Sequence, residues 1–271
     1  MTSGAALASA ADLLGTRLDA ELLLAHVLDA SRASVIARDE RELTPEEQGG
    51  FEQLLARRIA GEPLAYLTGV KEFWSLELEV TRDVLVPRPE TELLVEWALE
   101  LLPRARQARV LDIGTGSGAI ALALGKELPQ AQLTAVDVSA AALQVARGNA
   151  ARLRIGNVAF AKADLFEGLR GDGKFDLIVS NPPYVADQDP HLAELKFEPA
   201  VALTSGADGL VALRAIVGGA RERLGPAGWL LVEHGAAQGA AVRELFARAG
   251  FAAIETRRDL AGHERATGGH A

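Results

Sequence analysis

The residues best suited to carry out chemistry are Asn181, Pro182, Pro183 and Tyr184, called the tetrad below. They directly follow an apolar run at 175–180. Such a run predicts a strand, and open α/β sheets bind ligands just past the carboxyl ends of their strands. There, the side-chain oxygen of Asn181 and the backbone carbonyl of Pro182 can accept both hydrogens of a planar NH₂ group. The ring of Tyr184 can pack against the flat face of that group, which leaves the nitrogen lone pair aimed at an electrophile. The tetrad therefore predicts chemistry on a conjugated nitrogen, such as a carboxamide or an adenine amino group.

A glycine-rich turn follows another apolar run, 110–113, and leads into a helical apolar segment. The turn consists of Gly114, Thr115, Gly116, Ser117 and Gly118. Glycines at such a place let the backbone approach a ligand closely and begin the next helix tightly. A turn that serves only to pack the helix is the structural alternative.

Two acidic residues accompany this turn. Asp137 ends the next strand-like run, where a carboxylate can accept hydrogen bonds from both hydroxyls of a ribose. Asp112 precedes the turn and can bind the amino-acid end of a ligand directly or through the loop. A dinucleotide and S-adenosylmethionine both fit, but the glycines depart from the G-x-G-x-x-G spacing of dinucleotide sites. The tetrad also needs an electrophile, and a sulfonium methyl is one. We therefore expect S-adenosylmethionine as the cofactor and S-adenosylhomocysteine as its product.

A third candidate ligand contact follows the strand predicted near 157–162. Asp164 can accept from an adenine amino group and Leu165 can donate its backbone N–H, although a turn acid without a ligand fits equally well. Arg88 is expected either to form an ion pair or to line the cofactor mouth, and Glu198 either to order the loop over the tetrad or to cap a turn. With no cysteine and no histidines at ligand spacing, the sequence predicts no metal site, and His234 is expected to bond to nearby backbone.

The elements that must position these residues alternate along the chain. The first eighty residues indicate helices, with apolar positions at helical spacing over 13–27 and a helix start at Thr44 and Pro45. A short β segment at 73–80 and an extended connector at 84–90 follow. Beyond them, strands are predicted near 109–113, 132–137, 157–162, 175–180, 228–233 and 251–257, and helices near 91–101, 118–128, 140–153, 209–224 and 237–249. This alternation predicts an α/β fold with a doubly wound, mainly parallel sheet.

Charge and hydropathy argue against nucleic-acid and membrane partners. The net charge is −9, and residues 1–85 hold eight basic and fifteen acidic side chains. Nucleic-acid binders usually present a basic face to the phosphates, so no direct nucleic-acid partner is expected. No segment is long and apolar enough to span a bilayer, and the first residues lack the pattern of a secretory signal. We therefore expect a cytoplasmic protein with no membrane partner.

The sequence resembles the release-factor glutamine N5-methyltransferases over nearly its whole length. The matching stretches are 63–69, 71–74, 86–92, 114–118, 180–184, 197–199, 206–209 and 233–235. The resemblance implies methylation of the glutamine in the Gly-Gly-Gln motif of class-one peptide release factors. It implies a Rossmann-like methyltransferase fold with a seven-stranded sheet, divided into an N-terminal helical substrate-recognition domain (1–72), a β-hairpin linker (73–90) and a catalytic domain (91–271).

The resemblance also implies roles for individual residues. S-adenosylmethionine would be bound by the turn at 114–118, by Asp137 and by Asn181, and the substrate glutamine would be held by residues 181–184. Nothing in the chain demands more than a monomer. Two other functions remain open: an adenine-N6 nucleic-acid methyltransferase, which would need a basic cleft, and a non-catalytic binding module, which would show degenerate cofactor loops.

Overall fold

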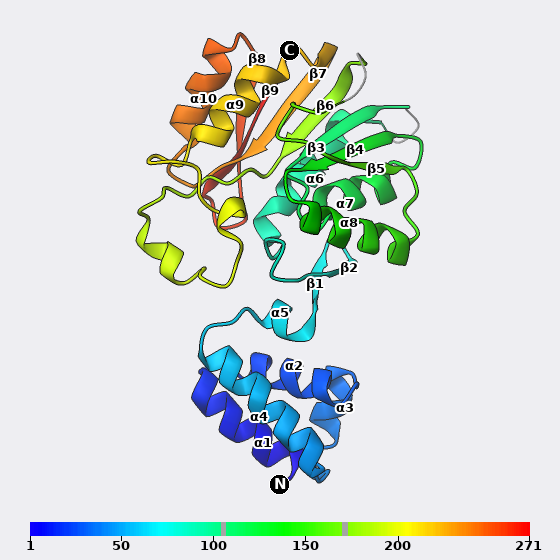
Figure 1. The fold of residues 1–271 in the computed structure, drawn as a ribbon, viewed down its shortest axis with the longest axis vertical. Coiled ribbons are helices and arrows are strands. Elements are labelled where there is room, and N and C mark those ends of the chain that lie inside the picture. The colour runs from blue at the N-terminus through cyan, green and yellow to red at the C-terminus, as the bar shows by residue number, and fades with distance from the viewer. Residues whose placement is uncertain (104–106, 170–172) are drawn as a thin grey trace. The chain divides into compact units, whose positions relative to one another are not determined.

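The computed structural model describes residues 1–103, 107–169 and 173–271 (Figure 1). These residues form two compact units, Met1–Val70 and Lys71–Ala271. None of the helices in the described part of the chain has the length and apolar character needed to cross a membrane.

The first unit is helical. It contains α1 (Ser3–Leu14), α2 (Arg17–Val27), α3 (Arg32–Ala37), α4 (Pro45–Ile59) and α5 (Leu64–Thr68). The helical pattern over 13–27 is divided between α1 and α2, because Gly15 adopts a left-handed φ of 67° and ends the first helix. The predicted start of α4 is confirmed: the Thr44 side chain accepts from the Glu47 N–H, and the Glu47 carboxylate accepts from the Thr44 N–H. The core of this unit is formed by buried apolar side chains such as Leu7, Leu23 and Phe51.

The second unit is built on a seven-stranded sheet of order β5-β4-β3-β6-β7-β9-β8. Its strands are β3 (Arg109–Ile113), β4 (Gln132–Asp137), β5 (Val158–Lys162), β6 (Phe175–Ser180), β7 (Leu224–Glu233), β8 (Ala252–Arg258) and β9 (Glu264–His270). The first five are parallel, and β9 runs antiparallel to both of its neighbours. The predicted fold class, a mostly parallel α/β sheet beside a small helical domain, is confirmed.

Strand β9 is the element that the hydrophobic pattern failed to predict. Its sequence is rich in small residues, and two glycines occupy its buried centre. A Cβ on Gly268 would lie 2.5 Å from Leu231 and 2.7 Å from Trp97, and one on Gly269 would lie 2.8 Å from Phe246. Large neighbours on both faces of the sheet therefore fill the space that side chains of β9 would need.

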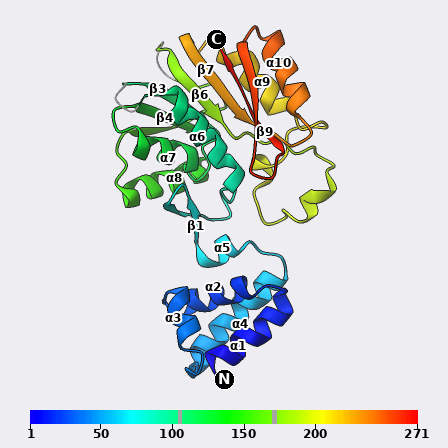
Figure 2. The same cartoon turned by 180° about the vertical axis from the view of Figure 1, so that it is seen from behind.

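Helices cover both faces of the sheet (Figures 1 and 2). Helices α6 (Glu92–Leu101), α7 (Ala119–Glu127) and α8 (Ala140–Leu153) lie on one face, and α9 (Val211–Ala220) and α10 (Gly239–Arg248) lie on the other. Successive side chains of β3 alternate between the two layers: Val110 joins the core beneath α6 and α7, whereas Leu111 joins the core beneath α9 and α10. The predicted helix at 209–224 is shorter in the structure because β7 already begins at Leu224.

A β-hairpin precedes the sheet. It consists of β1 (Val70–Phe73) and β2 (Leu76–Glu79), joined by Trp74 and Ser75 with φ values of 52° and 54°. Glu92 at the start of α6 accepts the Trp74 N–H at 2.8 Å. Phe73 and Leu78 are buried in the same core as α6 and α7. Residues 73–79 of the hairpin are therefore an integral part of the second unit.

Candidate active site

The site lies where the sheet changes direction. Strand β3 lies between β4 and β6, and the chain proceeds from β3 to β4 on one side and later returns to β6 on the other. Ile113 and Ser180 are register partners, and the Ser180 hydroxyl donates to the Ile113 carbonyl at 2.7 Å. The following residues, Gly114 and Asn181, are consequently neighbours. The glycine-rich turn and the tetrad, far apart in sequence, begin side by side at the crevice where α/β sheets bind ligands.

A pocket of about 510 Å³ opens at this edge of the sheet. Its volume is within the usual range for sites that bind small molecules. Of the residues that the sequence analysis assigned to the cofactor or the substrate, those that line it are Gly114, Thr115, Gly116, Ser117, Asp137, Asp164, Leu165, Asn181 and Pro183. Gly118, Pro182 and Tyr184 are not among the described residues that line the pocket. Pro182 is buried, and the other two have supporting contacts described below.

The glycine-rich turn depends on left-handed backbone. Gly114, Gly116 and Gly118 have φ values of 72°, 55° and 86°, which glycine adopts at little cost. The N–H groups of Gly114 and Thr115 both donate to the Val136 carbonyl at 2.9 Å. A Cβ on Gly116 would meet no heavy atom within 4 Å, whereas one on Gly118 would lie 3.0 Å from the Leu122 side chain. Gly116 therefore leaves the pocket open, and Gly118 allows α7 to pack.

Asp137 is fixed at the carboxyl end of β4. One of its carboxylate oxygens accepts the Gly116 N–H at 2.9 Å and the other accepts the Ser139 N–H at 2.8 Å. Each oxygen of a carboxylate can accept more than one hydrogen bond, so both retain acceptor capacity. Because the side chain is half-buried and lines the pocket, it can accept from two adjacent hydroxyl groups of a ligand.

Asp112 is bound to the glycine-rich turn through Thr115. It is buried, and the Thr115 hydroxyl donates to its Oδ2 atom at 2.6 Å. Its Oδ1 atom has no hydrogen-bond partner among the described residues. Burial raises the pKa of the Asp112 carboxyl to about 7. Since Asp112 is not among the pocket-lining residues of the described chain, the structure favours the indirect one of its two predicted roles, through Thr115 and the loop.

Asp164 and Leu165 form a tight turn after β5. The backbone groups of Asp164 and Glu167 pair with each other in both directions, at 3.1 and 2.8 Å. Leu165 has a φ of 51°, which is unfavourable for a residue with a side chain. Strained backbone of this kind clusters at ligand sites, and here the strained residue lines the pocket.

The tetrad is held by two residues to which sequence reasoning gave no role. The Asn181 Nδ2 donates to the Thr91 hydroxyl at 3.0 Å, and that hydroxyl donates to Glu233 Oε2 at 2.7 Å. The Tyr184 hydroxyl donates to the other oxygen of Glu233 at 3.1 Å. Glu233 ends β7, and Thr91 ends the short helix η1 (Pro89–Thr91). Both belong to stretches that carry the resemblance, but their distance in sequence hides the contact.

The carboxyl of Glu233 is buried. Only 1% of the residue is exposed. Burial raises the pKa of the Glu233 carboxyl to about 7, although the hydrogen bonds from Thr91 and Tyr184 oppose that rise. Burial also raises the pKa of the Tyr184 hydroxyl, and the nearby Glu233 carboxylate adds to this effect. Tyr184 therefore remains a neutral donor to Glu233.

A second buried carboxylate orders the loops around the pocket. Glu198 accepts the Val86 N–H at 3.0 Å through Oε2 and the Arg88 guanidinium through Oε1. Of the roles considered for Arg88, ion pairing and lining the pocket are both found. Glu198 joins the loop that follows the tetrad to the connector before α6, which favours its loop-ordering role.

Asn149 supports the glycine-rich turn from α8. It is fully buried, and its Nδ2 donates to the Ser117 carbonyl at 3.0 Å and to the Glu79 carbonyl at 2.9 Å. Its Oδ1 accepts the Glu79 N–H at 2.7 Å. One amide thus joins the glycine-rich turn to the β-hairpin, a link that no local sequence pattern indicates.

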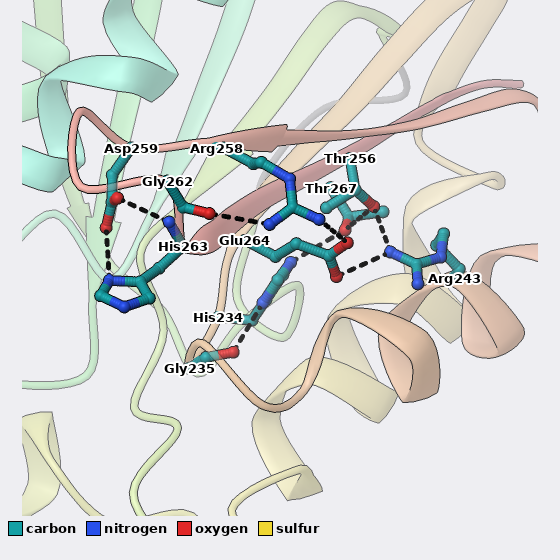
Figure 3. Close-up of polar contacts among 10 residues, drawn as sticks. All are labelled: His234, Gly235, Arg243, Thr256, Arg258, Asp259, Gly262, His263, Glu264 and Thr267. Atoms are coloured by element: carbon teal, nitrogen blue, oxygen red, sulfur yellow. Dashed lines mark hydrogen bonds and ion pairs between the residues drawn. The ribbon is translucent and has the colours of Figure 1, made fainter.

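His234 takes part in a chain of polar contacts that reaches Arg243 (Figure 3). Its Nδ1 contacts the Gly235 carbonyl at 2.9 Å, and its Nε2 contacts the Thr267 hydroxyl at 2.9 Å. Thr267 in turn contacts Thr256, which accepts from Arg243 at 3.0 Å. Burial lowers the pKa of His234. Its backbone contact is the one expected from sequence, and the described residues contain no group of three side chains able to hold a metal ion.

Known proteins share both the sequence and this fold. A family model described as the methyltransferase small domain matches residues 90–249, and one described as the PrmC N-terminal domain matches residues 3–69. The release factor glutamine methyltransferase of Bordetella pertussis is 51% identical to this chain over 94% of each sequence. The protein of that name from Escherichia coli is 47% identical and covers 93% of this chain and 91% of its own. A methyltransferase structure from Pyrococcus furiosus, 20% identical, shares the fold with a TM-score of 0.58 over 81% of this chain and 98% of its own. The chain belongs to the release factor glutamine methyltransferase family.

Proposed function

We propose that this protein transfers a methyl group from S-adenosylmethionine to the side-chain amide nitrogen (N5) of the glutamine in the Gly-Gly-Gln motif of class-one peptide release factors. Family membership supports the reaction and the substrate. The observation that carries the proposal structurally is the meeting of a glycine-rich turn and an oriented Asn181 amide at one pocket. One side of that pocket suits a nucleoside, and the other suits an NH₂ group.

The residues present fit the cofactor. Asp137 offers two anchored oxygens to the ribose hydroxyls, and the missing side chain at Gly116 leaves room beside it. In the proposal, the Asp164 carboxylate accepts from the adenine amino group and the Leu165 backbone N–H donates to a ring nitrogen; both residues line the pocket. Gly118 serves the site indirectly by letting α7 begin. When bound, S-adenosylmethionine supplies the electrophilic methyl group.

The tetrad would orient the substrate. In the proposal, Asn181 Oδ1 and the Pro182 carbonyl accept the two hydrogens of the glutamine amide, while Pro183 and the Tyr184 ring confine its plane. These contacts hold both N–H bonds away from the reaction line. No strong base is assigned, because the acidity of the N–H groups rises steeply as the nitrogen acquires positive charge. Orientation of this kind can contribute roughly 7–11 kcal/mol in well-aligned cases.

We also propose that three parts of the chain have different roles. Residues 1–72 would recognise the release factor, residues 73–90 would connect, and residues 91–271 would perform the transfer. We further propose that the protein acts as a monomer in the cytoplasm. No direct nucleic-acid partner or metal ion is included in the proposal.

The direct test uses purified protein, methyl-labelled S-adenosylmethionine and three substrates. These are a release factor, the same factor with its motif glutamine changed to alanine, and duplex DNA. Label in the intact factor alone supports the proposal; label in DNA, or none while the cofactor still binds, overturns it. The Asn181→Ala variant should lose about 10²–10³ in kcat, the usual effect of removing one oriented hydrogen-bond partner at a reacting centre. Its affinity for the cofactor should fall much less, and near-normal turnover would refute the role given to Asn181.

A further inference from the structure

A carboxamide has two ends of similar shape and opposite hydrogen-bonding character. The oxygen of Asn181 can accept from a substrate NH₂ group, whereas its own NH₂ could only oppose one. The tetrad works only if the oxygen faces the substrate, and the shape of the side chain does not select that orientation. Some neighbour must do so.

The neighbours of Asn181 select the orientation through the direction of their hydrogen bonds. At pH 8, above the raised pKa of its carboxyl, Glu233 is mostly ionised and can only accept, so the Thr91 hydroxyl gives its single proton to that carboxylate, at 2.7 Å. The hydroxyl oxygen then has only lone pairs to offer to Asn181. It can accept from the Nδ2 group, as it does at 3.0 Å, but it cannot donate to Oδ1. The carboxamide therefore has one favourable orientation.

We infer that Thr91 and Glu233 are positioning residues, which fix the Asn181 carboxamide so that its oxygen is presented to the substrate nitrogen. The same carboxylate holds the Tyr184 hydroxyl at 3.1 Å through its other oxygen. Glu233 thus sets both side chains of the tetrad that act on the amide, from the end of a different strand. This inference rests on the proposed function.

The burial of Glu233 argues for this role over a purely stabilising one. A carboxylate that is 1% exposed loses most of its hydration, and a neutral residue of the same shape would avoid that penalty. A carboxylate can accept from the Thr91 and Tyr184 hydroxyls at the same time, one through each oxygen, whereas a neutral amide has only one oxygen.

The test compares two substitutions of Thr91. Thr91→Val keeps the shape and removes the hydroxyl, whereas Thr91→Ser keeps the hydroxyl. We expect kcat on the release factor to fall about 10–100-fold in Thr91→Val, the range seen when a partner that orients a ligating side chain is removed. The KM for the release factor and the affinity for S-adenosylmethionine should change by no more than about threefold. The substitution removes an interaction that matters in the transition state and leaves ground-state binding intact. Thr91→Ser should restore most of the lost kcat.

A double-mutant cycle with Asn181 shows whether Thr91 acts through that residue. If it does, Thr91→Val should have little further effect in an Asn181→Ala background, because the amide that it orients is gone. The inference would be overturned if the two substitutions lowered kcat independently, so that the loss in the double variant equals the product of the single losses. Normal kcat in Thr91→Val would also overturn it. If the unaltered protein fails to label the release factor at all, the proposed function itself fails, which is a different result.

Glu233→Gln supplies a second readout. The substitution removes a buried charge, so the urea midpoint of the second unit should stay the same or rise at pH 8. Activity should nevertheless fall, by about tenfold or more, because the glutamine can donate to Thr91 and release the hydroxyl to face Asn181 Oδ1. A variant that unfolds more easily and loses activity only in proportion would indicate a structural role and overturn the inference.

Discussion

Asn149 offers a way to separate the stability of the fold from the order of the glycine-rich turn. Its amide makes three hydrogen bonds with the backbone, two with Glu79 and one with the Ser117 carbonyl, and its Oδ1 also accepts from Arg152 at 3.2 Å. Asn157 is its control, since the Nδ2 of this side chain contacts three backbone carbonyls, those of Gly125, Leu128 and Ala131. None of those three carbonyls belongs to the glycine-rich turn. Both asparagines therefore contact three backbone groups, and they differ in what they hold.

The magnitude follows from the bond count. At about 1 kcal/mol net for each hydrogen bond, Asn149→Ala should lower the free energy of unfolding by about 3–4 kcal/mol. Asn157→Ala should lower it by about 2 kcal/mol, because the two hydrogens of its NH₂ group are shared among three carbonyls. With a urea slope of about 3 kcal/mol/M, the midpoint should fall by about 1 M in Asn149→Ala and by about 0.7 M in Asn157→Ala. Only Asn149→Ala also frees the Ser117 carbonyl. Losing that one bond should weaken S-adenosylmethionine binding by about fivefold, the equivalent of about 1 kcal/mol.

Two measurements are sufficient. All three tryptophans, Trp74, Trp97 and Trp229, lie in the second unit, so their fluorescence during urea unfolding reports on that unit alone. Calorimetric titration with S-adenosylmethionine, under conditions where both variants are folded, gives the affinity. Equal losses of affinity in the two variants would refute the reasoning, because they would show that general destabilisation, and not the bond to Ser117, controls the turn.

Two further predictions concern the sheet and the buried histidine. Gly268→Ala should destabilise the second unit by about 1–3 kcal/mol, because its methyl group would overlap the Trp97 ring; Gly148→Ala, in an exposed and open part of α8, should instead stabilise it by about 0.5–1 kcal/mol. A lower urea midpoint in both would contradict the packing argument. Burial lowers the pKa of His234, so its contribution to stability is complete above the unfolded pKa of about 6.5 and is lost as the pH falls below it. His234→Gln should thus be more destabilised relative to the unaltered protein at pH 8 than at pH 5, and an equal difference in urea midpoint at both pH values would refute this.

Sequence predicted what depends on local rules. The cap at Thr44 follows from four adjacent residues, and the alternation of strands and helices predicted the sheet from β3 to β8. Strand order then explains why Gly114 and Asn181 meet, because both follow strands that pair directly. The resemblance implied a seven-stranded sheet, although the apolar pattern located only six of its strands.

The remainder depends on contacts between distant residues. Thr91 and Glu233 are 142 positions apart and meet only because the start of α6 and the end of β7 lie at the same edge of the sheet. Neither residue forms a spacing pattern with Asn181. Strand β9 was missed for a related reason. The side chains of Trp97 and Leu231 fill the space beside Gly268, so this position must be small, and the sequence of β9 alone does not reveal those neighbours.

The position of β9 has a consequence for how the protein is made. It pairs with β7 on one side and β8 on the other, yet it follows both in sequence. A nascent chain that has been synthesised only through β8 would hold β7 with an open edge, and β8 would have no strand to pair with. Exposed strand edges of this kind invite pairing with other chains. The second unit therefore cannot complete its sheet before β9 is available. It must wait, with its last edge unprotected, until residues 264–270 leave the ribosome.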